Sequence, residues 1–288
     1  MNFEGVRVGA VGAGNVSGDS PFNGFGGGIF SWNGASVRAI DCAIEGNISS
    51  NQGGGLSAFS FGAIELDSRT PAPGVIPGSR VVGNYTAGFG GGVAGYGGSL
   101  TIRSSFIVSN VAEAGGGVMS FASSGAVVNT IIAHNQASDM GDGIGVYMDP
   151  IDIQHCTIAE NNRTGVYADI FGPTPLLLQN SIVWGHTDEQ VSTNALAQFC
   201  DIEGGFPGPF NLNTNPLFVA ASALNYDLDG GSPCIDKGMT LVSVTNDCLL
   251  NPRPYGVGWD MGAYEYVPEP SVFIMAGLMM ILGMRRKS

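Results

Sequence analysis

The sequence predicts an all-β protein in which short parallel strands are stacked in successive coils, a solenoid with about 25 residues per coil. Glycine triplets recur at 26–28, 53–55, 90–92 and 115–117, and the variant Gly141-Asp142-Gly143 follows. Asparagines recur in step with them, at intervals of 37, 26, 25 and 26 residues: Asn47, Asn84, Asn110, Asn135 and Asn161. His186 takes the next position in this series. Repeats of this length indicate a structural unit that stacks on copies of itself.

Apolar and small residues keep fixed distances from the repeating asparagine. Three residues before it stand Ile44, Val81, Ile107, Ile132, Ile158 and Val183. Five residues before it stand Cys42, Ser79, Ser105, Thr130, Cys156 and Ser181. Eight residues before it stand Ala39, Ile76, Ile102, Val127, Ile153 and Leu178. The first two columns share a parity and should face inward together, so we expect a bend between them and the third column.

The asparagines and glycines have expected structural roles in each coil. We expect the asparagine to adopt a left-handed conformation at a corner and to bond to the turn of the next coil. The glycines should permit close backbone approach and positive φ angles. Residues 67–74 form an insert that explains the single long interval. A flexible Gly-rich linker is the alternative, but such linkers do not keep apolar columns in phase.

Composition excludes several classes of protein. The chain has 288 residues, 46 of them glycine, with 44% apolar and only 12% charged residues. Disordered chains are poor in apolar residues, so disorder is not expected. The net charge of −13 argues against a nucleic-acid partner, whose phosphates would be repelled. The five cysteines form no CxxC motif, which gives no support to a zinc or thioredoxin-type site.

The cysteine positions suggest at most one disulfide. Cys42 and Cys156 share a column but stand four coils apart, about 19 Å at the usual strand spacing, so they cannot pair. We interpret them as small core residues. Cys234 and Cys248 flank a short loop and could form a disulfide in an oxidising compartment, which leaves Cys200 unpaired.

The repeat unit Asn110-Val111-Ala112-Glu113-Ala114-Gly115-Gly116-Gly117-Val118 resembles the pectate-lyase-like repeats of bacterial surface proteins. The resemblance covers about residues 23–186 and implies a right-handed, single-stranded parallel β-helix. Residues 1–22 then correspond to one or more incomplete first coils. This fold carries lyases, hydrolases, adhesins and inert stalks, so the resemblance says little about chemistry.

Residues 187–266 are expected to form the last coils and a C-terminal cap, because the last coil of a solenoid must be covered. Their short motifs resemble the end of the choice-of-anchor Q β-helix proteins, which are exported: Asp201-Ile202-Glu203-Gly204-Gly205, Asn215-Pro216-Leu217-Phe218, Gly231-Ser232-Pro233-Cys234-Ile235-Asp236, Asn251-Pro252-Arg253-Pro254 and Asp260-Met261-Gly262-Ala263-Tyr264-Glu265. The chain departs from that family at Asp247-Cys248-Leu249-Leu250, where a glycine is usual. We expect Asp236, Arg253, Asp260 and Glu265 to satisfy buried backbone groups and one another.

The last residues, 267–288, resemble a PEP-CTERM sorting signal. Pro268, Glu269 and Pro270 precede the apolar stretch 271–284, and Arg285, Arg286 and Lys287 follow it. As a short hydrophobic helix, those 14 residues would span about 21 Å, less than the roughly 30 Å hydrocarbon core of a bilayer. The resemblance implies export, transient or stable membrane anchoring, and processing by an exosortase-type enzyme. Residues 1–10 lack the apolar run of a secretory signal, so we expect the chain to continue upstream or its start to be placed too late.

No catalytic constellation stands out in the sequence. The best acidic group is Glu113, Asp139 and Asp142, which could meet at one corner and bind Ca²⁺. No other cofactor is expected. The histidines fall at different phases of the repeat and should point in different directions: His134, His155 and His186. No nucleophile motif such as GxSxG occurs.

The sequence therefore favours a non-enzymatic, exported, surface-associated rod with a structural or glycan-binding role. Its expected partners are the sorting machinery, a membrane and extracellular polysaccharide. The alternative is a polysaccharide lyase or glycoside hydrolase of the pectate-lyase-like fold. A stacked set of acids together with a Lys or Arg on one face would favour that alternative, and the outward columns do not show it.

Overall fold

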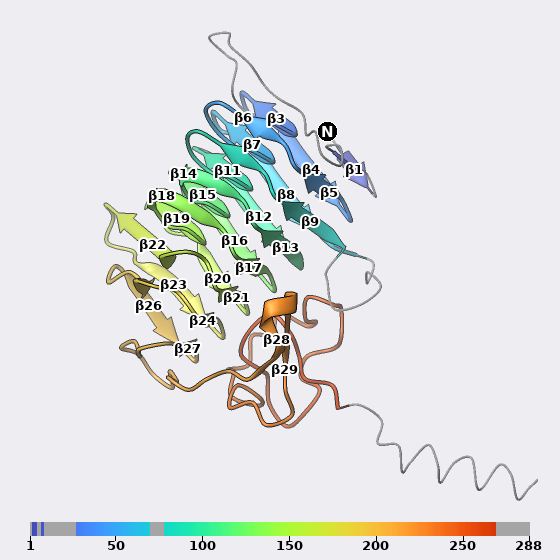
Figure 1. Cartoon of the computed structure of the whole chain (residues 1–288), viewed down its shortest axis with the longest axis vertical. Coiled ribbons are helices and arrows are strands. Elements are labelled where there is room, and N and C mark those ends of the chain that lie inside the picture. Colours follow the sequence, from blue (N-terminus) through green and yellow to red (C-terminus); the bar gives the residue numbers. More distant parts are fainter. Residues whose placement is uncertain (1, 5–6, 9–26, 70–77, 269–288) are drawn as a thin grey trace, which may run out of the picture.

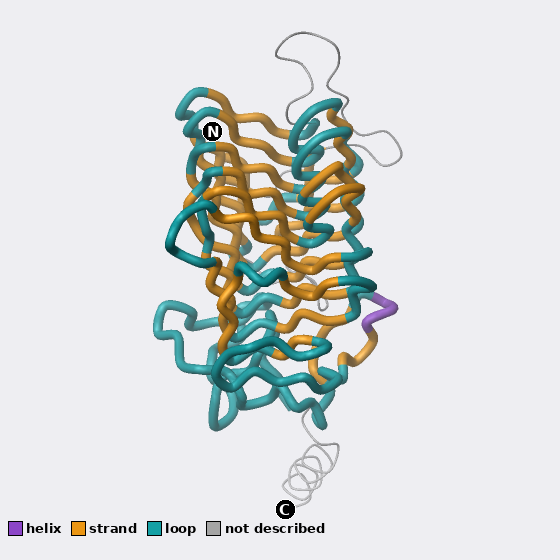
Figure 2. Tube along the Cα trace, turned by 90° about the vertical axis from the view of Figure 1, so that its left-hand side faces the viewer, coloured by secondary structure: helices purple, strands orange, loops and turns teal. Residues whose placement is uncertain are grey.

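The computed structural model describes residues 2–4, 7–8, 27–69 and 78–268. In these residues the chain winds into a stack of coils, and each coil adds one strand to each of several parallel sheets (Figures 1 and 2). The predicted all-β solenoid is confirmed. Helix in the described part of the chain is confined to the short 3-10 element η1 (Ala221–Ala223). The expected tail helix falls outside the described residues.

Two eight-stranded sheets form the first half of each coil. Sheet A contains β1 (Asn2–Glu4), β4 (Ser36–Ile40), β8 (Ala63–Asp67), β12 (Ser99–Arg103), β16 (Ser124–Val128), β20 (Asp152–Gln154), β23 (Leu176–Gln179) and β26 (Ala195–Gln198). Sheet B contains β2 (Arg7–Val8), β5 (Ala43–Glu45), β9 (Ser79–Val82), β13 (Ser105–Val108), β17 (Ile131–Ala133), β21 (Thr157–Ala159), β24 (Ile182–Trp184) and β27 (Asp201–Ile202). A tight bend separates the two sheets, as the parity change predicted.

Two further sheets complete the coil. Sheet C contains β6 (Ile48–Ser49), β10 (Tyr85–Thr86), β14 (Val111–Ala114) and β18 (Gln136–Met140). Sheet D contains β3 (Ile29–Trp32), β7 (Leu56–Phe59), β11 (Val93–Tyr96), β15 (Val118–Phe121), β19 (Ile144–Met148), β22 (Thr164–Ile170) and β25 (Glu189–Val191). The chain therefore runs A, B, C, D in each complete coil and returns to sheet A through a turn.

The predicted interior columns are buried. All six members of the column three residues before the asparagine are fully buried, as are the six members five residues before it. One assignment in the third column was wrong: Leu66 of β8, not Ile76, pairs with Ala39 and Ile102. The reason is that the insert follows this position, between β8 and β9, instead of standing before it. Ile76 lies outside the described residues.

The five repeating asparagines form a buried asparagine ladder. The Asn110 side chain illustrates it: its Nδ2 donates to the carbonyl oxygen of Val81 at 2.9 Å and to Oδ1 of Asn135 at 3.0 Å. Its Oδ1 accepts from the backbone N–H and from Nδ2 of Asn84, both at 2.9 Å. Each amide thus ties one coil to the next, which confirms the predicted structural role.

The conformational reason given for the asparagines was wrong. The residue in the left-handed region is the one directly before each asparagine, with φ of 57° at Ser109 and 52° at His134. The same position is glycine in two other coils, Gly46 and Gly83. The asparagine is needed for its amide, which spans the gap between coils, and the corner itself tolerates several residue types.

The ladder ends at His186, and this makes a substitution informative. Burial lowers the pKa of His186 to about 3, so the ring is neutral, and neither ring nitrogen has a hydrogen-bond partner among the described residues. His186→Asn would supply an amide oxygen for the backbone N–H and Nδ2 of Asn161. We expect the free energy of unfolding to rise by about 1–2 kcal/mol, measured by urea titration. His186→Ala, which lacks the amide, should give no such gain; equal stability of the two variants would contradict the prediction.

The glycine triplets allow adjacent coils to approach closely, as predicted. Gly90, the first of its triplet, has a φ of 70°. A Cβ atom on Gly91 would lie 2.5 Å from the carbonyl oxygen of Gly116 in the next coil. A side chain at this position would therefore force the two coils apart.

The C-terminal third divides into an end cap and a lobe. In residues 203–214, which follow the last coil, Phe206 packs against the main core and Leu212 exchanges backbone hydrogen bonds with Cys200 and Ile202. Residues 215–268 form the lobe, which includes the antiparallel hairpin β28 (Phe218–Ala220) and β29 (Asn225–Leu228). The lobe lies beside the coils, next to sheet B (Figure 1). The region 187–266, expected to hold the last coils and a cap, thus contains the last strands β25 to β27, the short covering segment 203–214 and most of the lobe.

The lobe covers an apolar stripe on the outside of sheet B. Side chains of sheet B pack there against the lobe: Phe106, Val108, Ile131, Ala133 and Ala159 meet Tyr226, Cys248, Ala263 and Tyr264. Hydrogen bonds join the two parts as well, from the Ala263 N–H to Thr157 Oγ1 at 3.0 Å and from Asn129 Nδ2 to the Asn246 carbonyl at 2.6 Å. In the two coils before Phe106, polar side chains replace this apolar stripe: Arg80 of β9 forms an ion pair with Glu45 of β5.

The disulfide expected between Cys234 and Cys248 is absent, since all five cysteines are free and buried. The two residues belong to different apolar clusters of the lobe. The Cys234 thiol lies 3.2 Å from a carboxylate oxygen of Asp201 and donates to it. Proximity in sequence misled the expectation, because the chain between the two cysteines crosses the lobe.

Candidate functional site

One aromatic side chain from each of five successive coils lies on the outer face of sheet D. Rings of neighbouring coils are 4.2–5.2 Å apart between centroids and nearly parallel in the centre, where Tyr96 and Phe121 are inclined by 5°. The stack consists of Trp32, Phe59, Tyr96, Phe121 and Tyr147. Phe171 closes it edge-on against Tyr147 at 5.2 Å. We call these six residues the aromatic ladder.

The aromatic ladder was missed in the sequence, although a signal for it exists. Each of the five stacked rings stands six residues after the first glycine of its triplet. Parallel pairing in register then places them one above another, as for Tyr96, Phe121 and Tyr147. Their partly exposed edges form a continuous apolar strip along the corner between sheets D and A.

A pocket of about 460 Å³ opens on sheet A beside the end of the aromatic ladder. The turns from sheet D to sheet A have two or three residues in the coils up to β20, namely 33–35, 60–62, 97–98, 122–123 and 149–151. The next turn, 171–175, has five. Residues of the turns 149–151 and 171–175 line the pocket together with sheet A: Gly125, Pro150, Asp152, Thr174, Pro175, Leu177 and Leu196. We call it the sheet A pocket. Loops that lengthen over a rigid scaffold are where proteins commonly place binding sites.

The chemistry of the sheet A pocket is mainly apolar. Leu196 is 58% exposed, and Asp152 is the one ionisable residue among those that line the pocket. Hydrolysis of a glycosidic bond normally needs two carboxyl groups, one as acid and one as base or nucleophile. The residues that line this pocket offer one carboxylate and no histidine, lysine or arginine.

Comparison with protein families identifies the coils. Residues 27–200 match the family described as the right-handed beta helix region, which is more than half of the chain. The chain belongs to this right-handed β-helix family. No curated protein and no solved structure gave a significant match. Family membership confirms the predicted architecture and is compatible with surface, binding and enzymatic roles alike.

The calcium candidates lie on the paired strands β14 and β18 and directly after β18, in different environments. Asp142 is fully buried, and its two carboxylate oxygens accept the N–H groups of Ala137 at 2.8 Å and Thr164 at 3.0 Å. Glu113 and Asp139 are exposed. In the described part of the chain, no group of three or more His, Cys, Asp or Glu side chains is arranged to hold a metal ion. Asp142 thus has a structural role, and calcium binding stays a prediction.

The histidines are dispersed, and one of them joins the β-helix to the lobe. His134 Nε2 lies 3.1 Å from the hydroxyl of Tyr226 and 3.2 Å from a carboxylate oxygen of Glu160. The Tyr226 hydroxyl donates to Glu160 at 3.0 Å. Tyr226 is fully buried, whereas the His134 and Glu160 side chains are partly exposed. The hydrogen bonds of this cluster fasten the lobe to the β-helix.

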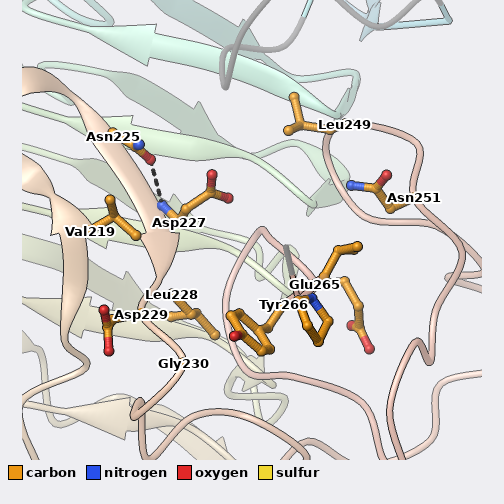
Figure 3. A pocket seen from close by; sticks show the side chains of 12 residues that line it. Val219, Asn225, Asp227, Leu228, Asp229, Gly230, Leu249, Asn251, Glu265 and Tyr266 are labelled. Atoms are coloured by element: carbon orange, nitrogen blue, oxygen red, sulfur yellow. Dashed lines mark hydrogen bonds between the residues drawn. The ribbon is translucent and has the colours of Figure 1, made fainter. Parts of the chain in front are cut away.

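The lobe has a pocket of its own, of about 590 Å³ (Figure 3). The carboxyl group of Asp227 extends from β29 toward the segment that carries Leu249 and Asn251. Burial and the nearby charge of Asp247 raise the pKa of Asp227 to about 6. Glu265, which also lines the pocket, is already paired with Arg253 at 2.7 Å. The four charged residues singled out in the sequence, Asp236, Arg253, Asp260 and Glu265, bond to one another and to the surrounding backbone, as expected.

The proposed sorting signal falls almost entirely outside the described residues, which end at Pro268. Glu269, Pro270, Arg285, Arg286 and Lys287 all lie beyond that point. Across the ranges that are described, no helix is long and apolar enough to span a bilayer.

Proposed function

We propose that this β-helix is a non-catalytic, surface-associated rod that binds extracellular polysaccharide along the aromatic ladder and the sheet A pocket. The aromatic ladder is the observation that carries the proposal. It presents ring edges from five successive coils, with the hydroxyl groups of Tyr96 and Tyr147 among them. Sugar rings combine apolar C–H faces with hydroxyl groups, and such a strip matches both.

The regular spacing of the strip suits a polymer better than a single small molecule. The stacked rings lie 4.2–5.2 Å apart, so a chain laid along the β-helix axis meets one aromatic residue per coil. Each contact can be weak, because repeated contacts along one chain add up through effective concentration. The sheet A pocket, at the end of the strip, offers a place for one sugar unit.

A role without catalysis is supported by the residues that are available. Lyases and hydrolases of acidic glycans need a base or an acid–base pair in contact with the sugar. The sheet A pocket supplies only Asp152, and the six residues of the aromatic ladder include no carboxylate, histidine, lysine or arginine.

Surface location is the second part of the proposal. It is supported by the resemblance of residues 267–288 to sorting signals that an exosortase-type enzyme processes. The lobe, which directly precedes that segment, is fastened to the side of sheet B. If the protein is attached to the cell surface through this segment, the attachment point lies next to the lobe, which packs on sheet B. The aromatic ladder on sheet D then stays accessible to a polysaccharide.

The binding role is tested with the double variant Tyr96→Thr, Tyr147→Thr. Threonine keeps the strand propensity of the site while it removes two rings. The intact protein should bind at least one polysaccharide in a panel of neutral, amino and acidic glycans, and the double variant should lose about tenfold or more in affinity. Tyr85→Thr is the matched control, since Tyr85 is 46% exposed on sheet C, away from the ladder. Equal loss in the control, or no binding at all, would refute the proposal.

A further inference from the structure

The outer face of β19 and β22 combines aromatic rings with a carboxylate. Tyr147 and Asp169 are register partners in adjacent coils. Tyr167 lies two residues before Asp169 on the same strand, so both side chains point to the same side of sheet D. Both are partly exposed, and so is Tyr147. The aromatic ladder therefore runs directly into a polar, acidic surface.

Carboxylates from three strands act electrostatically on Tyr167. Burial raises the pKa of Tyr167, and the negative charges of Asp169, Asp139 and Glu189 raise it further. Asp169 belongs to β22, Asp139 to β18 and Glu189 to β25. Asp139 and Glu189 are exposed to solvent. This part of the surface consequently carries a negative potential beside its aromatic rings.

The arginine that lies on this side of the β-helix does not cancel that potential. Arg163 Nη2 donates to the carbonyl oxygens of Ala137 at 2.8 Å and Asp139 at 3.0 Å. Its Nε lies 3.9 Å from the buried carboxylate of Asp142. The charge of Arg163 is thus compensated by Asp142, and the exposed carboxylates keep theirs.

We propose that the face formed by Tyr147, Tyr167 and Asp169 binds a polysaccharide of amino sugars through its ammonium groups. The inference rests on the proposed glycan-binding function and names its ligand class. Ammonium groups are attracted to aromatic rings and to carboxylates, and both stand here side by side. A polyuronate chain would instead meet like charge from this face and from a protein whose net charge is −13.

The ligand class is tested with three oligosaccharides of equal length and the intact chain. The probes are oligomers of glucosamine, N-acetylglucosamine and galacturonic acid, titrated calorimetrically at a pH where amino and carboxyl groups are both charged. The glucosamine oligomer should bind about tenfold more tightly than the N-acetylated one, and this advantage should shrink as salt is raised. The galacturonate oligomer should be the weakest ligand.

The site is tested with the double variant Asp169→Asn, Glu189→Gln. Both side chains lie at the surface, so the substitutions should leave the fold intact. The variant should lose about tenfold in affinity for the glucosamine oligomer and should bind the N-acetylated oligomer as before. Glu4→Gln is the control. It removes an exposed charge from β1, the first strand of sheet A and far along the stack of coils from β22, and should not change the affinity for either oligomer.

The outcomes separate this inference from the function on which it rests. Equal binding of the glucosamine and N-acetylated oligomers would overturn the ligand class and leave glycan binding standing. Undiminished affinity of the double variant would overturn the assigned face. Failure of every glycan to bind would overturn the proposed function together with the inference.

Discussion

Asn110→Ala is expected to lower the free energy of unfolding by about 3–5 kcal/mol, because it removes a buried amide that serves three coils. The backbone N–H and Nδ2 of Asn84 would lose their common acceptor, and the carbonyl of Val81 would lose its donor. None of these groups can turn to water, since Asn84 and Val81 are buried. Urea-induced unfolding followed by circular dichroism measures the loss.

Asn162→Ala is the matched control for this prediction. Asn162 is exposed and stands in the corner directly after the ladder residue Asn161. Its substitution should change stability by less than about 0.5 kcal/mol. If the two alanine variants proved equally stable, the asparagine ladder would not hold the coils together in the way described.

Arg253→Met is expected to destabilise the lobe by about 3–5 kcal/mol, the usual cost of leaving a buried charge without its partner. Arg253 Nη1 bonds to Glu265 at 2.7 Å, and both side chains are completely buried. Nη2 donates to the carbonyl oxygen of Gly262 at 2.8 Å. Hydrogen exchange should show faster exchange in residues 215–268 and little change in the asparagine ladder.

The partly exposed ion pair between Arg38 and Glu65 provides the control, at a similar distance of 2.8 Å. Arg38→Met should cost less than about 1 kcal/mol, because solvent screens the charges. A comparable cost for both variants would contradict the view that burial makes the Arg253 pair essential. Faster exchange throughout the coils of Arg253→Met would contradict the separate stability of the lobe.

The coils could be predicted because the residue pattern that produces them is repeated along the chain. Each copy of the repeat places an apolar residue, such as Ile107 or Ile132, where stacking buries it, and six copies in phase leave few alternatives. The asparagine ladder followed from the same periodicity. Its local conformation did not, because the left-handed angle belongs to the preceding residue, Ser109 in the coil of Asn110. Periodicity shows which positions are equivalent but leaves their φ angles open.

The position of the lobe could not be predicted in the same way, because it depends on contacts that occur once. The outward column that contains Phe106 and Ile131 is apolar, which signals that something covers it but does not say which segment does. The disulfide expectation failed for the related reason that distances across the lobe cannot be read from sequence spacing. The aromatic ladder was predictable in principle, since its rings follow the glycine triplets at a constant interval.

The central claim, a glycan-binding rod without catalysis, is tested most directly by incubating the intact protein with a panel of neutral, amino and acidic polysaccharides. Bound protein and newly formed reducing or unsaturated ends are measured in the same samples, with and without calcium. We predict retention on at least one polysaccharide with no new ends in any. New ends that grow with time and protein concentration would contradict the claim and support the lyase or hydrolase alternative, with Asp152 as the first residue to substitute.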